Sequence, residues 1–580
     1  MKKHPKLKSA MATLLAVCML ATFPACSGGG DGENSSTAQG GSSTTAETSG
    51  TTEESSEGGG TYDLSNLNEP GTVPVLKEKV PLSVLFVQDT NIEDMETNDY
   101  TKKLEEEVNL DLSFEYLPAG TDAKQKLALM ISGGDTLPDV ICMNLTPIET
   151  YSYGSQGYFQ PLNDLWDEVG YYSKDYWDND GAENMVYVTS PDGNIYGMPR
   201  VVEEIGNDYD HRMWINQTWL DALNLEMPTT TDEYYEVLKA FKEQDPNGNG
   251  IADEIPLMGN TDGWEHQPWK TLAYSFIYLN DYFDYLIPGE DGNLTVSFIQ
   301  PEFKDALAYL NKLCSEGLLD PLSFTQKQTE FKQVIENEEI QILGSMCAGS
   351  MSVYQVESVR KQDMTHMAPL TGPDGVCWTS YRNTSIPDHF GYITKDCSDP
   401  VAAFAMFDYM YTEDMTMQGR YGTKDVDWKE AAEGTTGMYA DMGWDARFEY
   451  INSIWGTLQN HEWGENHPTL RTYEMSGGQV WNGDEYDSQY MTAKAVPDYV
   501  DKIPDEIIFR LNYTQEEADS IAEFQANRDT LLNEAVAAFV TGTRPIDDFD
   551  NFVAEMQSIG LDNFLQVAQT AYDRMQSSEG

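Results

Sequence analysis

The chain has 580 residues, with 35 Lys and Arg set against 97 Asp and Glu, which gives a formal net charge of -62. Nucleic-acid binders need clustered Lys and Arg to displace the counterions of a phosphate backbone, so this balance excludes a nucleic-acid partner. It also excludes a basic helix on an anionic membrane surface. With 40% hydrophobic and 11% aromatic residues the chain can still build large cores, and its length allows roughly two to four domains.

The first 25 residues are typical of a secretory signal peptide. Lysines up to Lys8 precede an apolar run from Ala10 to Phe23, which is shorter than the about 20 apolar residues of a membrane-spanning helix. A small residue followed by Cys26 resembles a bacterial lipobox, which implies cleavage after residue 25 and lipid attachment to Cys26. Ordinary secretion is the alternative. Residues 26–70 then hold mostly Gly, Ser, Thr, Glu and Asn, which predicts a flexible linker.

Strand and helix patterns alternate in the next part of the chain. Leu82–Val87, Leu110–Tyr116 and Val140–Met143 are apolar or strand-like runs. Asp99–Val108 and Ala123–Ile131 lie between them and have the pattern of amphipathic helices. Continuous apolar strands that alternate with helices predict an α/β fold with a parallel sheet covered on both faces.

Several later segments resemble a known family. They are, in chain order, Gly133–Val140, Asp192–Pro199, Gly317–Pro321, Pro369–Gly375 and Asp399–Pro400. With the lipobox and linker, this ordered set resembles the extracellular solute-binding lipoproteins of bacterial ABC importers. It is most similar to the large sugar-binding subclass that includes alginate-oligosaccharide-binding proteins. The resemblance extends over residues 80 to 575.

The resemblance implies a two-lobed, periplasmic-binding-protein-like α/β fold with a ligand cleft between the lobes and several hinge crossings. We expect crossings near Pro199–Glu203, near Phe390–Lys395 and near 425–440. We predict that lobe 1 consists of residues 71–199 and a return segment, 390–430. Lobe 2 is predicted to consist of residues 200–389 and most of 431–580, which includes a helical C-terminal part.

One stretch has the spacing of a calcium-binding loop. Between Asp245 and Glu254, oxygen-bearing side chains recur at alternate positions and Gly250 stands at the sixth position. Ca²⁺ takes about 6 to 8 oxygen ligands. The ligands that we predict are Asp245, Asn247, Asn249, the carbonyl of Ile251, Asp253 and a bidentate Glu254. Pro256 at the twelfth position rules out a full EF-hand, and the sugar-binding subclass has the same shortened loop. The alternative is a plain Asx- and Gly-rich turn. We expect the ion to be structural.

The sequence contains no catalytic signature. With so many carboxylates, pairs of Asp or Glu carry no information about acid–base catalysis. His461 and His467 are six residues apart, and Gly464 interrupts the helix that a zinc protease would need to align them. A nucleophile elbow, a P-loop and a dinucleotide fingerprint are all missing from the sequence. We therefore predict that the protein is not an enzyme.

Aromatic residues are the first candidates for ligand binding, because sugar rings stack their C–H faces on aromatic rings. Trp264 and Trp269 lie in a polar, Gly- and Asp-bearing stretch just after the calcium loop, and Trp378 lies in a predicted loop. For each of the three, packing in a core or on the surface is the competing interpretation.

Further ligand-binding residues are implied by the resemblance alone. Asp89 and Asn144 end strands of the first lobe, and Arg200 follows the first hinge strand. Arg420 and Tyr421 lie in a turn that is singled out only by the resemblance, and pairing of Arg420 with an acid is the alternative. The resemblance therefore implies that these five residues contact the ligand.

The function implied is that of a membrane-anchored extracellular protein that captures an oligosaccharide and delivers it to ABC permease subunits. We expect a monomer that contacts the membrane only through its lipid. A secreted calcium-dependent glycoside hydrolase, a structural adhesin, and a binding protein for a peptide or another polar solute are alternatives. The charge of -62 favours a neutral ligand over an anionic one, unless Arg200, Arg212 and Arg420 create a local positive cleft.

Overall fold

The computed structural model describes residues 62–289, 292–337 and 339–578. The predicted signal peptide, Cys26 and the linker up to residue 61 lie outside this part of the chain. Residues 62–70, which we assigned to the linker, are folded: the Asn68 N–H donates to the Val75 carbonyl at 2.9 Å, and Leu64 and Leu67 pack against a hydrophobic core. The linker prediction is wrong for these residues because the two leucines supply apolar surface that can be buried. Among the described helices, none is long and apolar enough to cross a membrane.

The first sheet has six strands in the order β14-β4-β11-β3-β1-β2. Their bounds are β1 Val80–Val87, β2 Leu110–Leu117, β3 Val140–Leu145, β4 Met198–Val202, β11 Asp388–Ile393 and β14 Thr469–Arg471. Only β11 runs antiparallel to its neighbours. The three strands predicted between residues 82 and 143 are confirmed.

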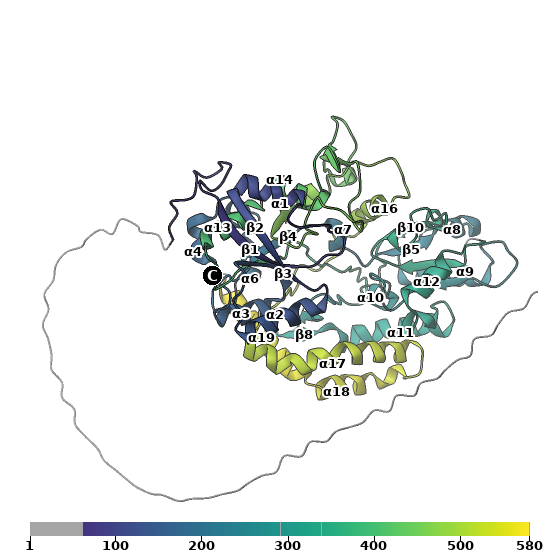
Figure 1. The fold of residues 1–580 in the computed structure, drawn as a ribbon. Coiled ribbons are helices and arrows are strands. Elements are labelled where there is room, and N and C mark those ends of the chain that lie inside the picture. The colour runs from purple at the N-terminus through teal and green to yellow at the C-terminus, as the bar shows by residue number, and fades with distance from the viewer. Residues whose placement is uncertain (1–61, 290–291, 338, 579–580) are drawn as a thin grey trace, which may run out of the picture. The chain divides into compact units, whose positions relative to one another are not determined.

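Helices cover both faces of this sheet, as the apolar runs predicted. In β1 the consecutive residues Val84, Leu85 and Phe86 are all buried, since Val84 and Phe86 join one core and Leu85 joins another. Among the helices with residues in the first core are α1 Asp99–Leu104, α4 Asn163–Val169 and α13 Pro400–Tyr409. Those in the second are α2 Thr121–Gly133 and α3 Pro147–Ser155 (Figure 1). The helix predicted over 99–108 continues α1 into a π-helical turn, η1 Glu105–Asn109.

The second sheet has four strands in the order β10-β5-β9-β6. They are β5 Met213–Asn216, β6 Ile255–Leu257, β9 Leu343–Cys347 and β10 Met364–Met367. One face of this sheet packs on a large core built with the helices α8 Gln217–Leu223, α9 Thr231–Glu243, α10 Pro268–Ala273 and α11 Pro301–Ser315. The other core contains residues of α12 Gln328–Ile335 and α16 Ser488–Ala495. The molecule therefore contains two α/β lobes.

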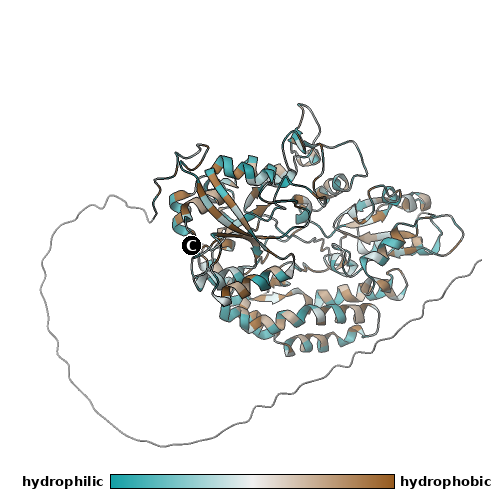
Figure 2. Cartoon of the chain, in the orientation of Figure 1, coloured by the Kyte–Doolittle hydropathy of each residue, from teal (hydrophilic) through white to brown (hydrophobic). Residues whose placement is uncertain are grey.

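The C-terminal part is helical, as predicted, and joins the second lobe. It consists of α17 Gln515–Val540, α18 Phe549–Ser558 and α19 Leu561–Ser578. Helix α17 packs along α11, and all three helices contribute to the large core (Figure 1). Hydrophilic and hydrophobic residues take different faces of these helices (Figure 2).

The remaining elements are short. The helices are α5 Lys174–Asp178, α6 Met185–Val188, α7 Ile205–Asp208, α14 Glu413–Tyr421 and α15 Tyr473–Ser476. Two hairpins are formed by β7 Leu286–Pro288 with β8 Leu294–Val296, and by β12 Trp428–Glu430 with β13 Phe448–Tyr450. The 3₁₀ turns are η2 Ala182–Asn184, η3 Ser297–Ile299, η4 Pro321–Phe324, η5 Met351–Val353, η6 Arg360–Asp363, η7 Ala440–Met442, η8 Val496–Asp498 and η9 Ile546–Asp548.

Crossing segments join the two sheets. Residues 203–212 connect β4 to β5, 368–387 connect β10 to β11, and 472–487 connect β14 to α16, apart from short helical turns within them. The first begins at Glu203, so the crossing predicted over Pro199–Glu203 is displaced: nearly all of that stretch belongs to β4 Met198–Val202, inside the first sheet. The crossing expected over Phe390–Lys395 is wrong, because residues 388–393 form a strand inside the first sheet. The one expected near 425–440 is also misplaced, because that stretch lies between α14 and β14, which pack together.

One buried carboxylate holds the three crossings together. Asp208, in the first crossing, accepts the Thr384 N–H of the second and the Tyr473 hydroxyl of the third, both at 2.6 Å. Its side chain is completely buried. Burial raises the pKa of Asp208 to about 6.

Replacing this carboxylate is expected to remove a pH-dependent loss of stability. Unfolded Asp has a pKa of about 3.9, so the folded state binds more protons between about pH 4 and pH 6, and the free energy of unfolding falls as the pH rises through this range. The loss is on the order of 2–3 kcal/mol. In Asp208→Asn it should be absent, because an amide does not ionise and can still accept the Thr384 N–H. Urea unfolding across this pH range measures the effect.

The exposed Asp445 provides the matched control. Asp445→Asn should keep the pH dependence of the wild type. If Asp208→Asn also keeps it, the assignment of this dependence to Asp208 is contradicted.

Candidate functional site

All three crossing segments attach to the same edge of the first sheet, and the two that reach the second sheet attach to the same edge of it. Strands β1, β3, β4 and β14 run in the same direction, so their carboxyl ends share an edge, and the reversed β11 begins there. In the second sheet, β6, β9 and β10 end where β5 begins. We call these the first-sheet edge and the second-sheet edge. Open α/β sheets bind ligands at the carboxyl ends of their strands, so the site is expected at these edges.

Arg200 of β4 lies at the first-sheet edge. Its guanidinium donates to the Asp388 carboxylate of β11 at 3.0 Å and to the Glu465 carbonyl at 3.3 Å. The same group lies 4.2 Å from the centre of the Phe390 ring. Arg200 therefore links β4, β11 and the loop that contains Glu465.

Glu465 attracts two further arginines to this edge. Its carboxylate lies 3.5 Å from Arg420 of α14 and 3.5 Å from Arg471 of β14. Burial disfavours ionisation of Glu465, but the charges of Arg471, Arg420 and Arg200 lower its pKa. Arg420 also lies 4.0 Å from the ring of Trp455, which is 38% exposed. The edge therefore offers a half-exposed aromatic ring beside a buried, charge-balanced cluster.

The structure brings some of the predicted first-lobe residues together. Asp89 lies beside the Glu465 loop. A Cβ atom added at Gly464 of this loop would lie 3.0 Å from the Asp89 carboxylate. Asn144 is exposed in the next-to-last position of β3. Tyr421, in contrast, is buried, with its ring centre 4.2 Å from that of Phe448. Its packing role leaves almost no side-chain surface for a ligand.

Trp264 lies at the second-sheet edge, in the loop after β6. Its indole is 39% exposed, and Nε1 donates to the carboxylate of the completely buried Asp210 at 3.0 Å. The Tyr282 hydroxyl donates to the same carboxylate oxygen at 2.7 Å and lies 2.8 Å from Glu265 Oε1. Trp264 is therefore a half-exposed ring whose polar edge is fixed by a buried acid.

A network of buried charges supports this edge. His211 Nε2 lies 2.8 Å from Glu265 Oε2 and 3.3 Å from Asp281 Oδ2. Burial opposes protonation of His211, but these two carboxylates outweigh it and raise its pKa to about 10. The Asp281 carboxylate lies 2.9 Å from Lys270 Nζ and also accepts the Tyr274 hydroxyl at 2.7 Å. The charges are therefore paired within the lobe.

The acids of this network do not form a convincing metal site. Asp210, His211 and Glu265 bring potential ligand atoms within 4.8 Å of one another. However, the Asp210 oxygen already accepts from Trp264 and Tyr282, and His211 Nε2 is paired with the carboxylates of Glu265 and Asp281. We interpret the cluster as a salt-bridge network.

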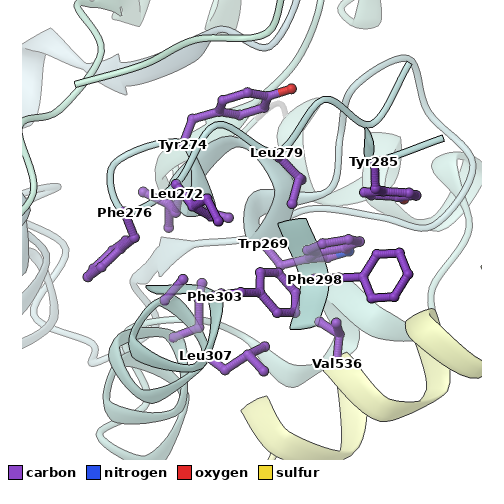
Figure 3. Close-up of a cluster of buried hydrophobic side chains, with 14 of the residues drawn as sticks. Trp269, Leu272, Tyr274, Phe276, Leu279, Tyr285, Phe298, Phe303, Leu307 and Val536 are labelled. Carbon is purple, nitrogen blue, oxygen red and sulfur yellow. The ribbon is translucent and has the colours of Figure 1, made fainter. Parts of the chain in front are cut away.

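The other two predicted tryptophans lie closer to the large core. Trp269 is only 3% exposed and lies among Phe298, Phe303 and Val536 (Figure 3). The prediction that it contacts a ligand conflicts with this burial, and the competing core interpretation describes it better. Trp378 is half-buried, packs against the same core and lines a small pocket with Tyr274.

The predicted calcium loop turns its polar side chains inward. The Asp245 carboxylate accepts the main-chain N–H groups of Asn249 at 3.1 Å and Gly250 at 3.0 Å. The side-chain amides of Asn247 and Asn249 contact the Asp253 carboxylate at 3.2 and 3.1 Å. An asparagine turned about its last bond would present its oxygen in place of its nitrogen. The loop therefore gathers four of the six predicted ligands.

Glu254 provides the observation that points to a cation. Its Oε1 atom is buried and has no hydrogen-bond partner among the described residues. Burial raises the pKa of Glu254, and the charges of Asp253 and Asp245 raise it further. The Ile251 side chain is exposed, and its carbonyl accepts the Asp253 N–H at 3.1 Å. Oxygen ligands with uncompensated negative charge fit Ca²⁺.

Several residues of the two edges were not predicted from the sequence. They are Asp210, Glu265, Tyr282, Asp388, Trp455, Glu465 and Arg471. The local signal for the Glu465 loop in the sequence is the stretch from His461 to His467, which resembles a zinc motif but lacks its spacing. His467 is in fact buried, and burial lowers its pKa to about 4.

Two α/β lobes joined by crossings, with aromatic and polar side chains at the joined edges, define a two-lobed solute-binding protein. The chain belongs to the bacterial extracellular solute-binding protein family, whose model matches residues 94–417. The fructooligosaccharide ABC transporter substrate-binding protein FusA of Streptococcus pneumoniae is 26% identical over 497 residues, which cover 79% of this chain and 84% of FusA.

Solved structures share the fold. FusA in complex with kestose has a TM-score of 0.64 at 23% identity, covering 86% of this chain and 100% of that chain. An extracellular solute-binding protein of Bifidobacterium longum subsp. infantis has a TM-score of 0.70 at 20% identity, covering 86% and 98%. Alginate-binding protein AlgQ2, solved without calcium ion, has a TM-score of 0.56 at 21% identity, covering 87% and 100%. The predicted two-lobed fold and family are confirmed.

Proposed function

We propose that the protein captures an oligosaccharide outside the cell, between the two sheet edges, and delivers it to the permease subunits of an ABC importer. The observation that carries this proposal is the half-exposed Trp264 ring, fixed by the buried Asp210 at the second-sheet edge. Fixed aromatic rings beside polar groups suit sugars, whose C–H faces stack while their hydroxyls form hydrogen bonds. The relative FusA is named for fructooligosaccharide transport, which supports the same ligand class.

The charges at the edges favour a neutral sugar. The three arginines of the first-sheet edge already face Glu465, and Arg200 also pairs with Asp388. Among the described residues of this edge, these arginines are thus paired with acids, while the chain as a whole carries a charge of -62. An anionic sugar would therefore approach against the field of the protein.

We further propose that the protein binds its ligand without chemical turnover and acts as a monomer. The family and FusA are described by binding and transport, not by hydrolysis. The predicted lipid on Cys26 and the linker after it would hold the lobes near the permease, and the lipid would be the sole membrane contact.

The loop at 245–254 is proposed to hold one structural Ca²⁺ ion. Asp245, Asn247, Asn249, the Ile251 carbonyl, Asp253 and Glu254 would be its ligands. The partnerless Glu254 oxygen supports this assignment. A FusA structure described as an EF-hand mutant, 23% identical and with a TM-score of 0.60, supports a comparable loop in a protein of this fold.

The sugar proposal predicts a ligand-dependent thermal shift. Kestose and nystose should raise the melting temperature of the lipid-free protein in calcium, increasingly as their concentration exceeds the dissociation constant. Alginate oligosaccharides should give a smaller shift at low ionic strength. Trp264→Ala should abolish the kestose shift, whereas Trp481→Ala should retain it, because Trp481 stacks on Tyr490 with its Nε1 bonded to the Asp484 carbonyl.

Chromatography of the same mixtures tests for turnover. Intact kestose supports a binding protein, and accumulating fructose would favour the glycoside hydrolase. If no sugar shifts the melting temperature and none is cleaved, the carbohydrate assignment is contradicted.

The calcium proposal predicts that chelation lowers stability without any sugar present. EGTA should lower the melting temperature of the wild type, and added Ca²⁺ should restore it. Glu254→Gln should weaken calcium binding in calorimetry by about tenfold or more, because a bidentate carboxylate is lost. Glu236→Gln, which changes an exposed acid of the neighbouring helix α9, should bind calcium like the wild type. A melting temperature unaffected by EGTA would refute the site.

A further inference from the structure

The Trp264 ring is held from two sides. On its polar edge, Nε1 donates to Asp210 Oδ2 at 3.0 Å. On one of its faces it lies against Gly349, where an added Cβ would come within 2.5 Å of the ring atoms Cδ2 and Cε2. The Gly349 N–H also donates to the Trp264 carbonyl at 2.9 Å. Neither the ring nor its main chain can move freely while these contacts last.

The surroundings of Asp210 hold its carboxylate in the position where it accepts the Trp264 N–H. It is completely buried, and the same oxygen that accepts from Trp264 accepts from the Tyr282 hydroxyl at 2.7 Å. Burying a carboxylate is costly unless donors and positive charges compensate it. Burial raises the pKa of Asp210, and the nearby charges of His211 and Arg212 offset part of this cost. Asp210 therefore has a reason to stay in one place, and Trp264 is tied to it.

Asp210 also lies in the first crossing segment. Two residues further on, Arg212 is completely buried and donates to the carbonyls of Gly349 and Gly206. Gly349 lies under the Trp264 ring, and Gly206 belongs to the crossing itself. The ring is consequently oriented by the segment that connects the lobes and not by its own loop alone.

We propose that Asp210 is a positioning residue that holds the Trp264 indole ready to stack on the C–H face of a sugar ring. This inference rests on the proposed function and adds to it the residue that sets the geometry of the stacking surface. A ring that is ordered before binding loses less conformational entropy when the sugar arrives, so fixing it raises affinity. Asp210 acts through Trp264 and has no contact of its own with the sugar.

A double-mutant cycle measured by calorimetry with kestose tests the inference. Asp210→Ala removes the acceptor and should weaken kestose binding about tenfold, a loss typical of a displaced anchor residue. Asp210→Asn keeps an oxygen acceptor in the same place and should bind within about threefold of the wild type. In a Trp264→Phe background, Asp210→Ala should change the affinity by less than about threefold, because the Nε1–H that it holds is gone.

Trp481→Phe provides the matched control background. It also replaces an indole by a phenyl ring, but the Trp481 indole donates to the Asp484 carbonyl and not to Asp210. There Asp210→Ala should keep its full effect. An equal effect in the Trp264→Phe and Trp481→Phe backgrounds would overturn the inference, as would an Asp210→Ala protein that binds kestose like the wild type.

Gly349→Ala disturbs the face of the Trp264 ring instead of its polar edge. It is the alternative variant if Asp210→Ala does not fold. Its methyl group should displace the indole and weaken kestose binding about tenfold in the wild type, but far less in the Trp264→Phe background. Unchanged affinity in Gly349→Ala would contradict a pre-positioned ring.

Fluorine NMR of protein labelled with 5-fluorotryptophan tests the positioning without any sugar. The Trp264 signal, assigned from its absence in Trp264→Phe, should shift or broaden in Asp210→Ala and return toward its wild-type position in Asp210→Asn. The Trp481 signal should stay unchanged. If kestose fails to bind the wild type, the sugar assignment fails, and this measurement still decides the role of Asp210. An unaltered Trp264 signal in Asp210→Ala overturns it.

Discussion

The crossing segment 203–212 must bury four charged side chains, and much of the structure depends on how it does so. These are Asp208, Asp210, His211 and Arg212, and each needs partners because an isolated buried charge is very costly. Asp208 is compensated by the other two crossings, and Asp210 by Trp264 and Tyr282. The segment thus sets the connection between the lobes and the orientation of the stacking ring at once.

This arrangement explains how an acidic chain can offer a sugar a largely neutral surface. The overall charge of -62 describes the molecule as a whole, whereas the charges at the sheet edges are paired locally. Glu465 faces Arg420 and Arg471, and His211 is held between carboxylates. The rings of Trp264 and Trp455 are half-exposed at the two edges, and they suit the apolar faces of a sugar.

The sequence predicted the elements of the fold better than the surroundings of individual side chains. Apolar runs such as Val84–Phe86 identified buried strands because local pattern and burial coincide there. Trp264 and Trp269 shared the same polar neighbourhood in sequence, yet Trp269 is covered by residues of α11 and α17 that come much later in the chain. Glu465 likewise gathers arginines from separate elements, which no local motif records. Burial and charge pairing of this kind are tertiary properties.

A crystal structure of the calcium-loaded protein with kestose would test whether a sugar ring stacks on Trp264 between the two sheet edges. We expect a sugar ring parallel to the exposed indole face, with carbon atoms within about 4 Å of it, and Trp264 Nε1 still bonded to Asp210. Kestose bound elsewhere, with the Trp264 ring left open to solvent, would show that Trp264 is not the stacking surface.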